Sequence, residues 1–340
     1  MFAFPRQILA TFCALVTGCA VAADPNASAF ASVKALGRGV NLGNALDAPN
    51  EGEWGITIKP EYLTAIRKAG FQHVRVPVRW SNHAKADAPF TIDEKFFARV
   101  DEVLDQATKA GLQVVLDLHH YDELYPDPAA HRERFFGLWK QIAEHYKDRP
   151  DSVLFEPLNE PNGKLTPSAW NDLFADVLRI IRKSNPTRIV VVGPGQWNGF
   201  RELKNLRLPA DDRRLLVTFH YYEPFEFTHQ GATWVKDSDK WLGRTWTGSD
   251  SEKAGVRDAF TTVTNWSEAN RRPIYLGEFG AFSKADMDSR ARWTTFVRSE
   301  AERRGFAWAY WEFGSTFGVF NPETNQWREP LLRALIPGKN

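Results

Sequence analysis

Eight short runs of mainly apolar residues alternate along this chain with longer amphipathic stretches, and this alternation constrains the fold more than any other feature. Several of the runs are almost continuously apolar, which is typical of parallel strands covered on both faces. The predicted strands are Gly39–Leu42, His73–Val78, Gln113–Leu118, Val153–Glu156, Arg188–Val192, Leu215–Phe219, Ile274–Leu276 and Phe306–Tyr310. Eight strand–helix units predict an α/β fold, a single (β/α)8 TIM barrel, with a doubly wound open sheet as the alternative.

Helical patterns separate the predicted strands. In the segment Phe96–Ala110 the apolar residues fall on one face, as in an amphipathic helix. Similar patterns occur at Arg134–Tyr146, Ala169–Lys183 and Asp288–Arg303. A longer excursion between Tyr221 and Asp250 contains three tryptophans and is predicted to form a rim loop. The pattern has no Pro- or Ser-rich linker, so we expect one domain over residues 23–340.

The first 22 residues have the pattern of an export signal. Arg6 precedes an apolar stretch from Ile8 to Thr17, which is too short to span a bilayer as a helix. Small residues follow, and they offer a cleavage site after Ala22. We therefore expect residues 1–22 to be a signal peptide and the mature protein to be secreted or periplasmic in a bacterium.

A second interpretation of this segment concerns Cys19. The residues Val16-Thr17-Gly18-Cys19 resemble the processing site of a bacterial lipoprotein, where cleavage before Cys19 leaves a lipid anchor at the outer membrane or cell surface. We favour free secretion, because the residues after Cys19 supply only a short tether before the barrel. Cys13 and Cys19 are the only cysteines, so the mature fold has no intramolecular disulfide, Cys nucleophile or Cys-ligated metal.

Charge and composition exclude other classes of protein. Forty-three Lys and Arg residues against 42 Asp and Glu residues give a net charge of +1, which argues against a general nucleic-acid-binding surface. Apolar residues make up 43% of the chain and charged residues 25%, as in a globular protein. The 13 Trp and 24 Phe suit a core, and they also suit a surface that binds flat, hydroxylated rings.

Polar and aromatic side chains recur at the ends of the predicted strands, where TIM barrels carry their active sites. The candidates in chain order are Asn44, Arg75, His119, His120, Asn159, Glu160, His220, Tyr222, Glu278 and Trp311. A single strand-end glutamate is more often a helix-cap neighbour or a solvated rim residue. Two glutamates, three histidines and several aromatic residues on one rim indicate a functional site instead.

Glu160 and Glu278 follow the fourth and seventh predicted strands, which lie on opposite sides of an eight-stranded barrel. Their side chains can converge near the axis at about 5–5.5 Å, the separation expected of a retaining glycosidase. In such an enzyme one carboxyl group protonates the leaving oxygen, and the other is ionised and attacks the anomeric carbon. The pair therefore predicts hydrolysis of a glycosidic bond.

Several motifs occur in an order that resembles glycoside hydrolase family 5, and most nearly its bacterial β-1,4-endoglucanases. The main motifs are Leu158-Asn159-Glu160-Pro161 and Gly277-Glu278-Phe279-Gly280, with Arg75, His119-His120 and His220-Tyr221-Tyr222. Further similar stretches are Asn41-Leu42-Gly43-Asn44, Phe225–Gly231 and Tyr310-Trp311-Glu312-Phe313. The resemblance runs from about Gly37 to Ile336. A lone Asn-Glu-Pro is a weak signal, but the ordered set is specific.

The resemblance implies a retaining double displacement, with Glu160 as the general acid/base and Glu278 as the nucleophile. Asn159 would bind the sugar 2-hydroxyl, and Tyr222 and Arg75 would hold Glu278 ionised. The other implied contacts are to the substrate: His119, His120 and His220 line the subsites, Asn44 contacts a hydroxyl, and Trp234 and Trp311 stack on sugar rings. We expect a monomer without metal or cofactor that acts on a β-linked polysaccharide or oligosaccharide.

Two features lie outside this pattern. Pro157 has no backbone N–H to donate beside Asn159, so the fourth strand is expected to stop or bulge there. The dipeptide Gln196-Trp197 follows the fifth strand and has no assigned role.

Other functions are open alternatives. Glucose and mannose differ only at C2, so a β-mannanase, or dual specificity at the same site, is the main one. A metal-dependent barrel hydrolase is a distant one, because the first strand lacks His-x-His and the adjacent His119 and His120 are expected to point to opposite sides of a strand. A non-catalytic polysaccharide-binding protein is another, but it has no need of both carboxylates.

Overall fold

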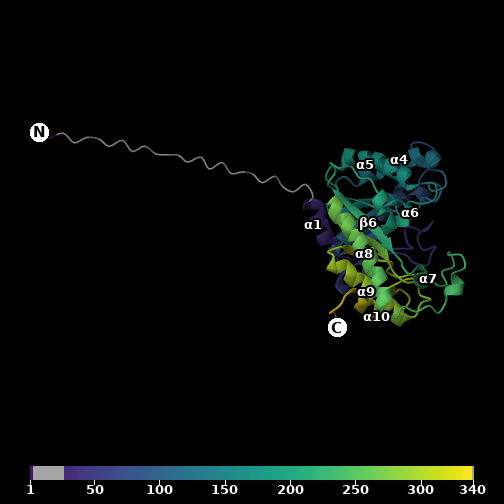
Figure 1. Cartoon of the computed structure of the whole chain (residues 1–340). Helices are drawn as coiled ribbons and strands as arrows, with labels where there is room; N and C mark the ends of the chain where they lie inside the picture. Colours follow the sequence, from purple (N-terminus) through teal and green to yellow (C-terminus); the bar gives the residue numbers. More distant parts are fainter. Residues whose placement is uncertain (3–26, 339–340) are drawn as a thin grey trace.

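The computed structural model (Figure 1) describes residues 1–2 and 27–338. In this part of the chain eight parallel strands form a closed barrel in sequence order. Hydrogen bonds join each strand to the next, and β1 closes the ring against β8. The strands are β1 (Arg38–Asn41), β2 (His73–Val78), β3 (Gln113–Leu118), β4 (Val153–Glu156), β5 (Val190–Val192), β6 (Leu215–Tyr221), β7 (Ile274–Phe279) and β8 (Ala307–Tyr310). The single (β/α)8 barrel is confirmed, and the open sheet is excluded.

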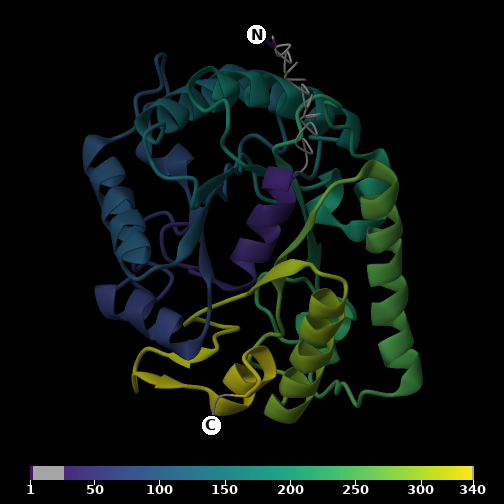
Figure 2. The ribbon, with the colours of Figure 1, turned by 90° about the vertical axis from the view of Figure 1, so that its left-hand side faces the viewer.

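Helices surround the barrel (Figure 2). The longer ones are α2 (Pro60–Ala69), α3 (Glu94–Lys109), α4 (Pro128–His145), α5 (Pro167–Ser184), α8 (Asp250–Asn270), α9 (Met287–Arg303) and α10 (Glu329–Leu335). Five begin at a side chain that accepts a hydrogen bond from a backbone N–H of the first turn: Asp93, Asp127, Thr166, Ser249 and Asp286. These caps place the start of each predicted helix one to six residues earlier than its apolar pattern does.

The interior of the barrel is apolar at one end and polar at the other. Helix α1 (Ala27–Leu36) crosses the end where the strands begin and lies at the centre of the ring of helices in Figure 2. Its Val33 and Leu36 belong to the same buried cluster as Leu216 of β6. Near the opposite end, Arg75 and Asp117 are fully buried inside the strands. The interior of the barrel therefore has a charged cluster at one end and buried apolar side chains at the other.

Two strands extend further than the sequence predicts. Strands β6 and β7 run on to Tyr221 and Phe279, so His220 and Glu278 lie inside strands rather than after them. The pairing of β6 with β7 shifts register between Phe219 and His220. Such an irregularity re-aims side chains, and here it lies directly at a candidate site residue.

Two other strand ends follow from local chemistry. Strand β4 ends at Glu156, immediately before Pro157, as predicted. Strand β5 begins at Val190, two residues later than predicted. Arg188 lies before it, and its guanidinium donates to the carbonyls of Tyr146, just after α4, and Val153, the first residue of β4.

The excursion between Tyr221 and Asp250 lies at the end of the barrel away from α1, around helix α7 (Phe225–Thr228) in Figure 1. It also carries the 3-10 helix η3 (Ser238–Trp241). Apart from its first two residues, the predicted signal peptide, with Cys13 and Cys19, lies outside the described residues. Within the described residues, no helix combines the length and apolar character that crossing a bilayer requires.

Candidate active site

Arg75 on β2 is the centre of the charged cluster. Its guanidinium donates to both oxygens of Glu156 at 2.7 and 2.9 Å and to Glu278 Oε1 at 2.8 Å. Its Nη2 lies 3.0 Å from Asp117 Oδ2 and donates to Asn159 Oδ1 at 2.8 Å. Burial alone would lower the pKa of Arg75, but the carboxylates around it raise that pKa well above its usual value. Arg75 therefore stays positively charged, and its contacts join β2 to β3, β4 and β7.

Glu278 on β7 is held from two sides. Its Oε1 accepts from Arg75, and its Oε2 accepts from the Tyr222 hydroxyl at 2.8 Å. Both contacts were predicted, and both favour the carboxylate. Burial has the larger effect and raises the pKa of Glu278 to about 7, against the lowering by His220 and Arg75. Arg75 and Tyr222 thus fix the orientation of the Glu278 carboxylate, and its burial keeps that carboxylate basic.

Glu160 lies four residues beyond the end of β4 with a left-handed backbone, φ 45°. A glutamate rarely adopts this conformation, and strained residues cluster at functional sites. Its Oε1 lies 2.6 Å from Nδ1 of His220, and 25% of its side chain is exposed. Burial raises the pKa of Glu160 to about 7, opposed by the charge of Arg75.

The two glutamates converge at the centre of the barrel mouth. Donor atoms of Glu160, His220 and Glu278 all lie within 4.8 Å of one another. His220 links the pair, because its Nδ1 also lies 3.5 Å from Glu278 Oε2. Its other ring nitrogen faces the Asn198 amide at 3.3 Å. Burial lowers the pKa of His220 to about 4, so the ring is neutral at neutral pH.

His119 and His120 do not point to opposite sides, and that expectation was wrong. They follow the last residue of β3, Leu118, and their rings meet edge to face with centroids 4.7 Å apart. Strand alternation therefore does not apply to them. His119 Nδ1 lies 2.6 Å from Asp117 Oδ2, and its ring stacks on Trp311 at 5.2 Å.

The aromatic candidates lie around this centre with different exposure. A side chain at Gly43 would collide with the Trp311 ring, its Cβ only 2.6 Å from the nearest ring atom, so the backbone there must be glycine. Trp234 is 58% exposed and packs edge-on against Phe282. Asn44 is half-buried, and its backbone N–H donates to Asp47. Among the described residues, no hydrogen bond joins the Asn44 side chain to the Arg75 cluster.

Sequence reasoning missed several residues of the site. Asn41, Asp117 and Glu156 bind Arg75 directly, and Asp47 and Glu312 are also fully buried carboxylates. Burial raises the pKa of both Asp47 and Glu312 to about 7. The available signal was a polar residue inside an apolar run, as in Val114–Leu118 and Val153–Glu156.

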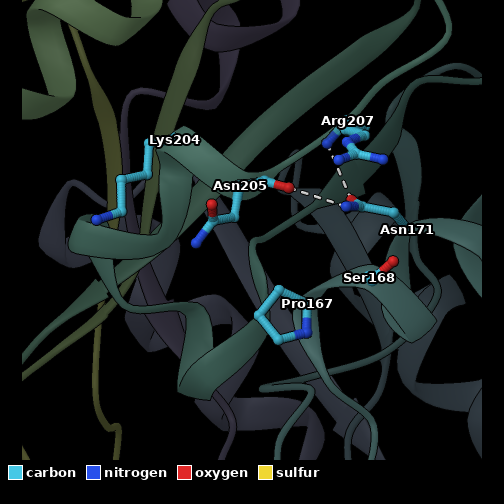
Figure 3. Close-up of a pocket in the computed structure, with 6 residues that line it drawn as sticks. All are labelled: Pro167, Ser168, Asn171, Lys204, Asn205 and Arg207. Carbon is cyan, nitrogen blue, oxygen red and sulfur yellow. Dashed lines mark hydrogen bonds between the residues drawn. The ribbon is translucent and has the colours of Figure 1, made fainter.

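Two groups among the described residues have donor atoms close enough for a metal ion: Glu160, His220 and Glu278, and Asp47, His119 and His120. A separate surface hollow of about 280 Å³ lies between α5 and the 3-10 helix η2 (Phe200–Asn205) (Figure 3). Figure 3 shows both ends of the Asn171 amide bonded to backbone there, to Asn205 and Arg207. The hollow contains none of the candidate site residues.

Comparison with known proteins identifies the family of this chain. The cellulase model (glycosyl hydrolase family 5) matches residues 33–316. Endoglucanase H of Acetivibrio thermocellus is 40% identical over 324 residues, which cover 93% of this chain and 34% of that protein. Cellulase/esterase CelE of the same organism is 32% identical and covers 92% of this chain and 40% of that protein. The chain thus spans between a third and two fifths of the length of these two relatives.

Solved structures agree with the sequence comparison. The endoglucanase Cel5A from the hyperthermophilic Thermotoga maritima is 51% identical, superposes with a TM-score of 0.89 and covers 92% of this chain and 100% of its own. The cellulose synthase subunit Z of Clostridioides difficile is 40% identical with a TM-score of 0.86, covering 88% and 99%. This chain therefore belongs to glycosyl hydrolase family 5, a family of glycoside hydrolases.

Proposed function

We propose that this chain is a retaining endo-β-1,4-glucanase, and the observation that carries the proposal is the pair of central carboxyl groups. An oxygen of Glu160 and an oxygen of Glu278 lie within 4.8 Å of each other. This upper limit supports the separation of about 5–5.5 Å between the carboxyl groups of retaining enzymes, because the roughly 6.5–9.5 Å of inverting enzymes leaves room for a water molecule between the two groups. The different surroundings of the two groups support different roles.

In the first step Glu278 attacks the anomeric carbon, and the bond from that carbon to the leaving oxygen breaks. Glu160 gives its proton to that oxygen, and the sugar is left as an ester of Glu278. Burial raises the pKa of both carboxyl groups to about 7, but Arg75 and Tyr222 donate to Glu278 and stabilise its ionised form, so the proton is assigned to Glu160. Glu160, now ionised, then takes a proton from a water whose oxygen attacks the same carbon and releases Glu278.

The neighbouring residues have supporting roles in this proposal. Asn159 binds the sugar 2-hydroxyl, and Arg75 and Tyr222 hold the nucleophile. His220 orients Glu160 through the 2.6 Å contact. The remaining residues form the subsites: Asn44, His119, His120, Trp234 and Trp311. Residues 23–340 form the catalytic unit, which we propose acts as a monomer without metal or cofactor.

A glucan is the first candidate substrate, and a mannan is the second. The Cel5A of Thermotoga maritima, 51% identical to this chain, has been solved with cellobiose and with mannotriose. We therefore expect reducing sugar to be released fastest from carboxymethyl cellulose and mixed-linkage glucan, more slowly from glucomannan and mannan. Viscosity should fall early, as endo cleavage requires, and NMR should show the β-anomer first. Failure on all four polymers, or an α-product, would contradict the proposal.

Two tryptophans test how the substrate is held. Trp311→Ala should lower kcat/KM by about 100-fold, because the Trp311 ring fixes His119 and a small misplacement spoils the attack geometry.

Trp234→Ala should raise KM about 2- to 10-fold with little change in kcat. This is the pattern expected when a side chain binds the substrate and the transition state equally well. The control is Trp246→Phe, a buried residue of the same excursion, which should lower the melting temperature only. Unchanged kinetics with lost stability in Trp234→Ala would assign Trp234 to packing instead.

We propose that the protein is exported and free, with the signal cleaved after Ala22. The alternative is a lipid-anchored chain that begins at Cys19, since several acyl chains hold a protein firmly at about 0.8 kcal/mol per buried methylene. The intact mass of the mature protein from its native host decides between them. Acyl groups on Cys19 that disappear in Cys19→Ala would refute free secretion.

A further inference from the structure

Asp47, His119 and His120 form a second group of ligands beside the catalytic centre. Their donor atoms all lie within 4.8 Å of one another, although the three residues come from two different strand ends. We propose that this group binds one divalent late-transition-metal ion, such as Zn²⁺, on the face of Trp311 that His119 occupies. Imidazole and carboxylate are ordinary zinc ligands, and three protein ligands leave one position open to water.

The orientation of His119 is that of a metal ligand. Its Nδ1 lies 2.6 Å from Asp117 Oδ2, so the proton sits there and Nε2 carries the lone pair. The contacts of Nε2 are long: the Asn159 amide nitrogen lies 3.4 Å away and Glu278 Oε1 lies 4.0 Å away, so a metal ion would replace only the long Asn159 contact. A carboxylate behind a histidine is the usual second contact of zinc-binding histidines, because it fixes the ring and its tautomer. Asp117 in turn is held by Arg75 at 3.0 Å.

The cations nearest to this group are already paired with carboxylates. Arg75 is neutralised by its carboxylates, and Arg79 is paired with Asp122 at 3.0 Å. Asp47 supplies the carboxylate ligand; its Oδ2 accepts from the backbone N–H of Asn44 at 3.0 Å and its Oδ1 from that of Ala45 at 2.8 Å.

The other ligand group suits a cation less well. Between Glu160 and Glu278, the Nδ1 of His220 already lies 2.6 Å from one carboxylate and 3.5 Å from the other. Arg75 also lies 2.8 Å from Glu278. A metal ion there would have to displace these short contacts, whereas the His120 ring is 30% exposed and its Nδ1 makes only a 4.0 Å contact with Asp122.

The test is calorimetric titration of the chelator-treated, full mature chain with ZnCl₂ at neutral pH. We expect one Zn²⁺ per chain, with binding about 10- to 100-fold weaker in Asp117→Asn and weakened at least as much in His120→Ala. His145→Gln is the matched control, because His145 also lies beside an aspartate, 2.9 Å from Asp101, but on the outer helix α4. It should bind Zn²⁺ as the wild type does.

The inference is overturned if the chain binds no Zn²⁺, if His120→Ala binds it as tightly as the wild type, or if only His220→Ala loses it. Since Zn²⁺ would occupy the sugar-binding side of the mouth, it should raise KM for a soluble glucan without changing kcat. This last readout rests on the proposed function, whereas the calorimetry does not. An inactive chain that still binds Zn²⁺ through His120 would refute only the glucanase proposal.

Discussion

Glu278→Ala is expected to lower turnover by about 10⁴-fold or more on every substrate, whatever its leaving group, because no glycosyl ester can form. Glu160→Ala is expected to fail differently. Hydrolysis of polymer should fall by about 10²–10⁴-fold, the usual contribution of a general acid/base. An activated aryl glycoside needs no proton for departure, so its first step should survive and the intermediate should accumulate as a burst.

Azide separates the two variants. With Glu160→Ala it should attack the accumulated ester from the face that water uses and give a β-glycosyl azide, restoring turnover. With Glu278→Ala no ester exists, so no β-azide should appear. Glu268→Gln, an exposed glutamate on α8, is the control and should behave as the wild type. Full polymer activity in either active-site variant would refute the assignment.

Arg75→Met is expected to have the second largest effect, on both stability and activity. It removes a cation that contacts Asp117, Glu156 and Glu278, all three of them buried. Breaking a buried ion pair from one side costs about 3–5 kcal/mol of unfolding free energy, because charge is left uncompensated. Denaturant unfolding measures this loss.

The same variant should change the pH dependence. Arg75 lowers the pKa of Glu278, so its removal raises that pKa. The nucleophile must be ionised, and the acid limb of kcat/KM should therefore move to higher pH. Arg38→Met is the control, since Arg38 pairs with Glu302 at 2.7 Å but is partly exposed at the start of β1. It should cost less than about 1 kcal/mol and leave the pH profile unchanged. If the acid limb of kcat/KM stays at the same pH in Arg75→Met, Arg75 does not influence the pKa of Glu278, and this prediction is wrong.

The sequence alone determined the barrel and the two central glutamates. Both depend on local patterns: apolar runs of strand length, and polar residues where those runs stop. Once eight such runs form a closed ring, residues at the carboxyl ends of the fourth and the seventh strand must meet at the same mouth. Arg75, Tyr222 and His220 were placed near the same mouth for the same reason, and the roles predicted for them came from the resemblance to the family.

The partners inside the cluster were decided only by the tertiary structure. Arg75 and Glu278 are 203 positions apart, and Arg75 and Glu156 are 81 apart, so their contacts depend on strand register. The register shift after Phe219 has no local signal, yet it aims His220 between the two glutamates. Asp117 looked like an isolated polar residue in an apolar strand, although it binds both Arg75 and His119.

The side chains around the rim of the barrel mouth were also decided only by the tertiary structure. Trp234 and Trp246 lie in one excursion with similar surroundings in sequence, but one is mostly exposed and the other is buried against α9, where its backbone N–H donates to Ser289. His119 and His120 converge because β3 ends at Leu118, and strand alternation predicted the opposite. Periodicity fixes the direction of a side chain only within a regular element. Where strands end and loops begin, long-range packing sets that direction, and in this barrel the site is built there.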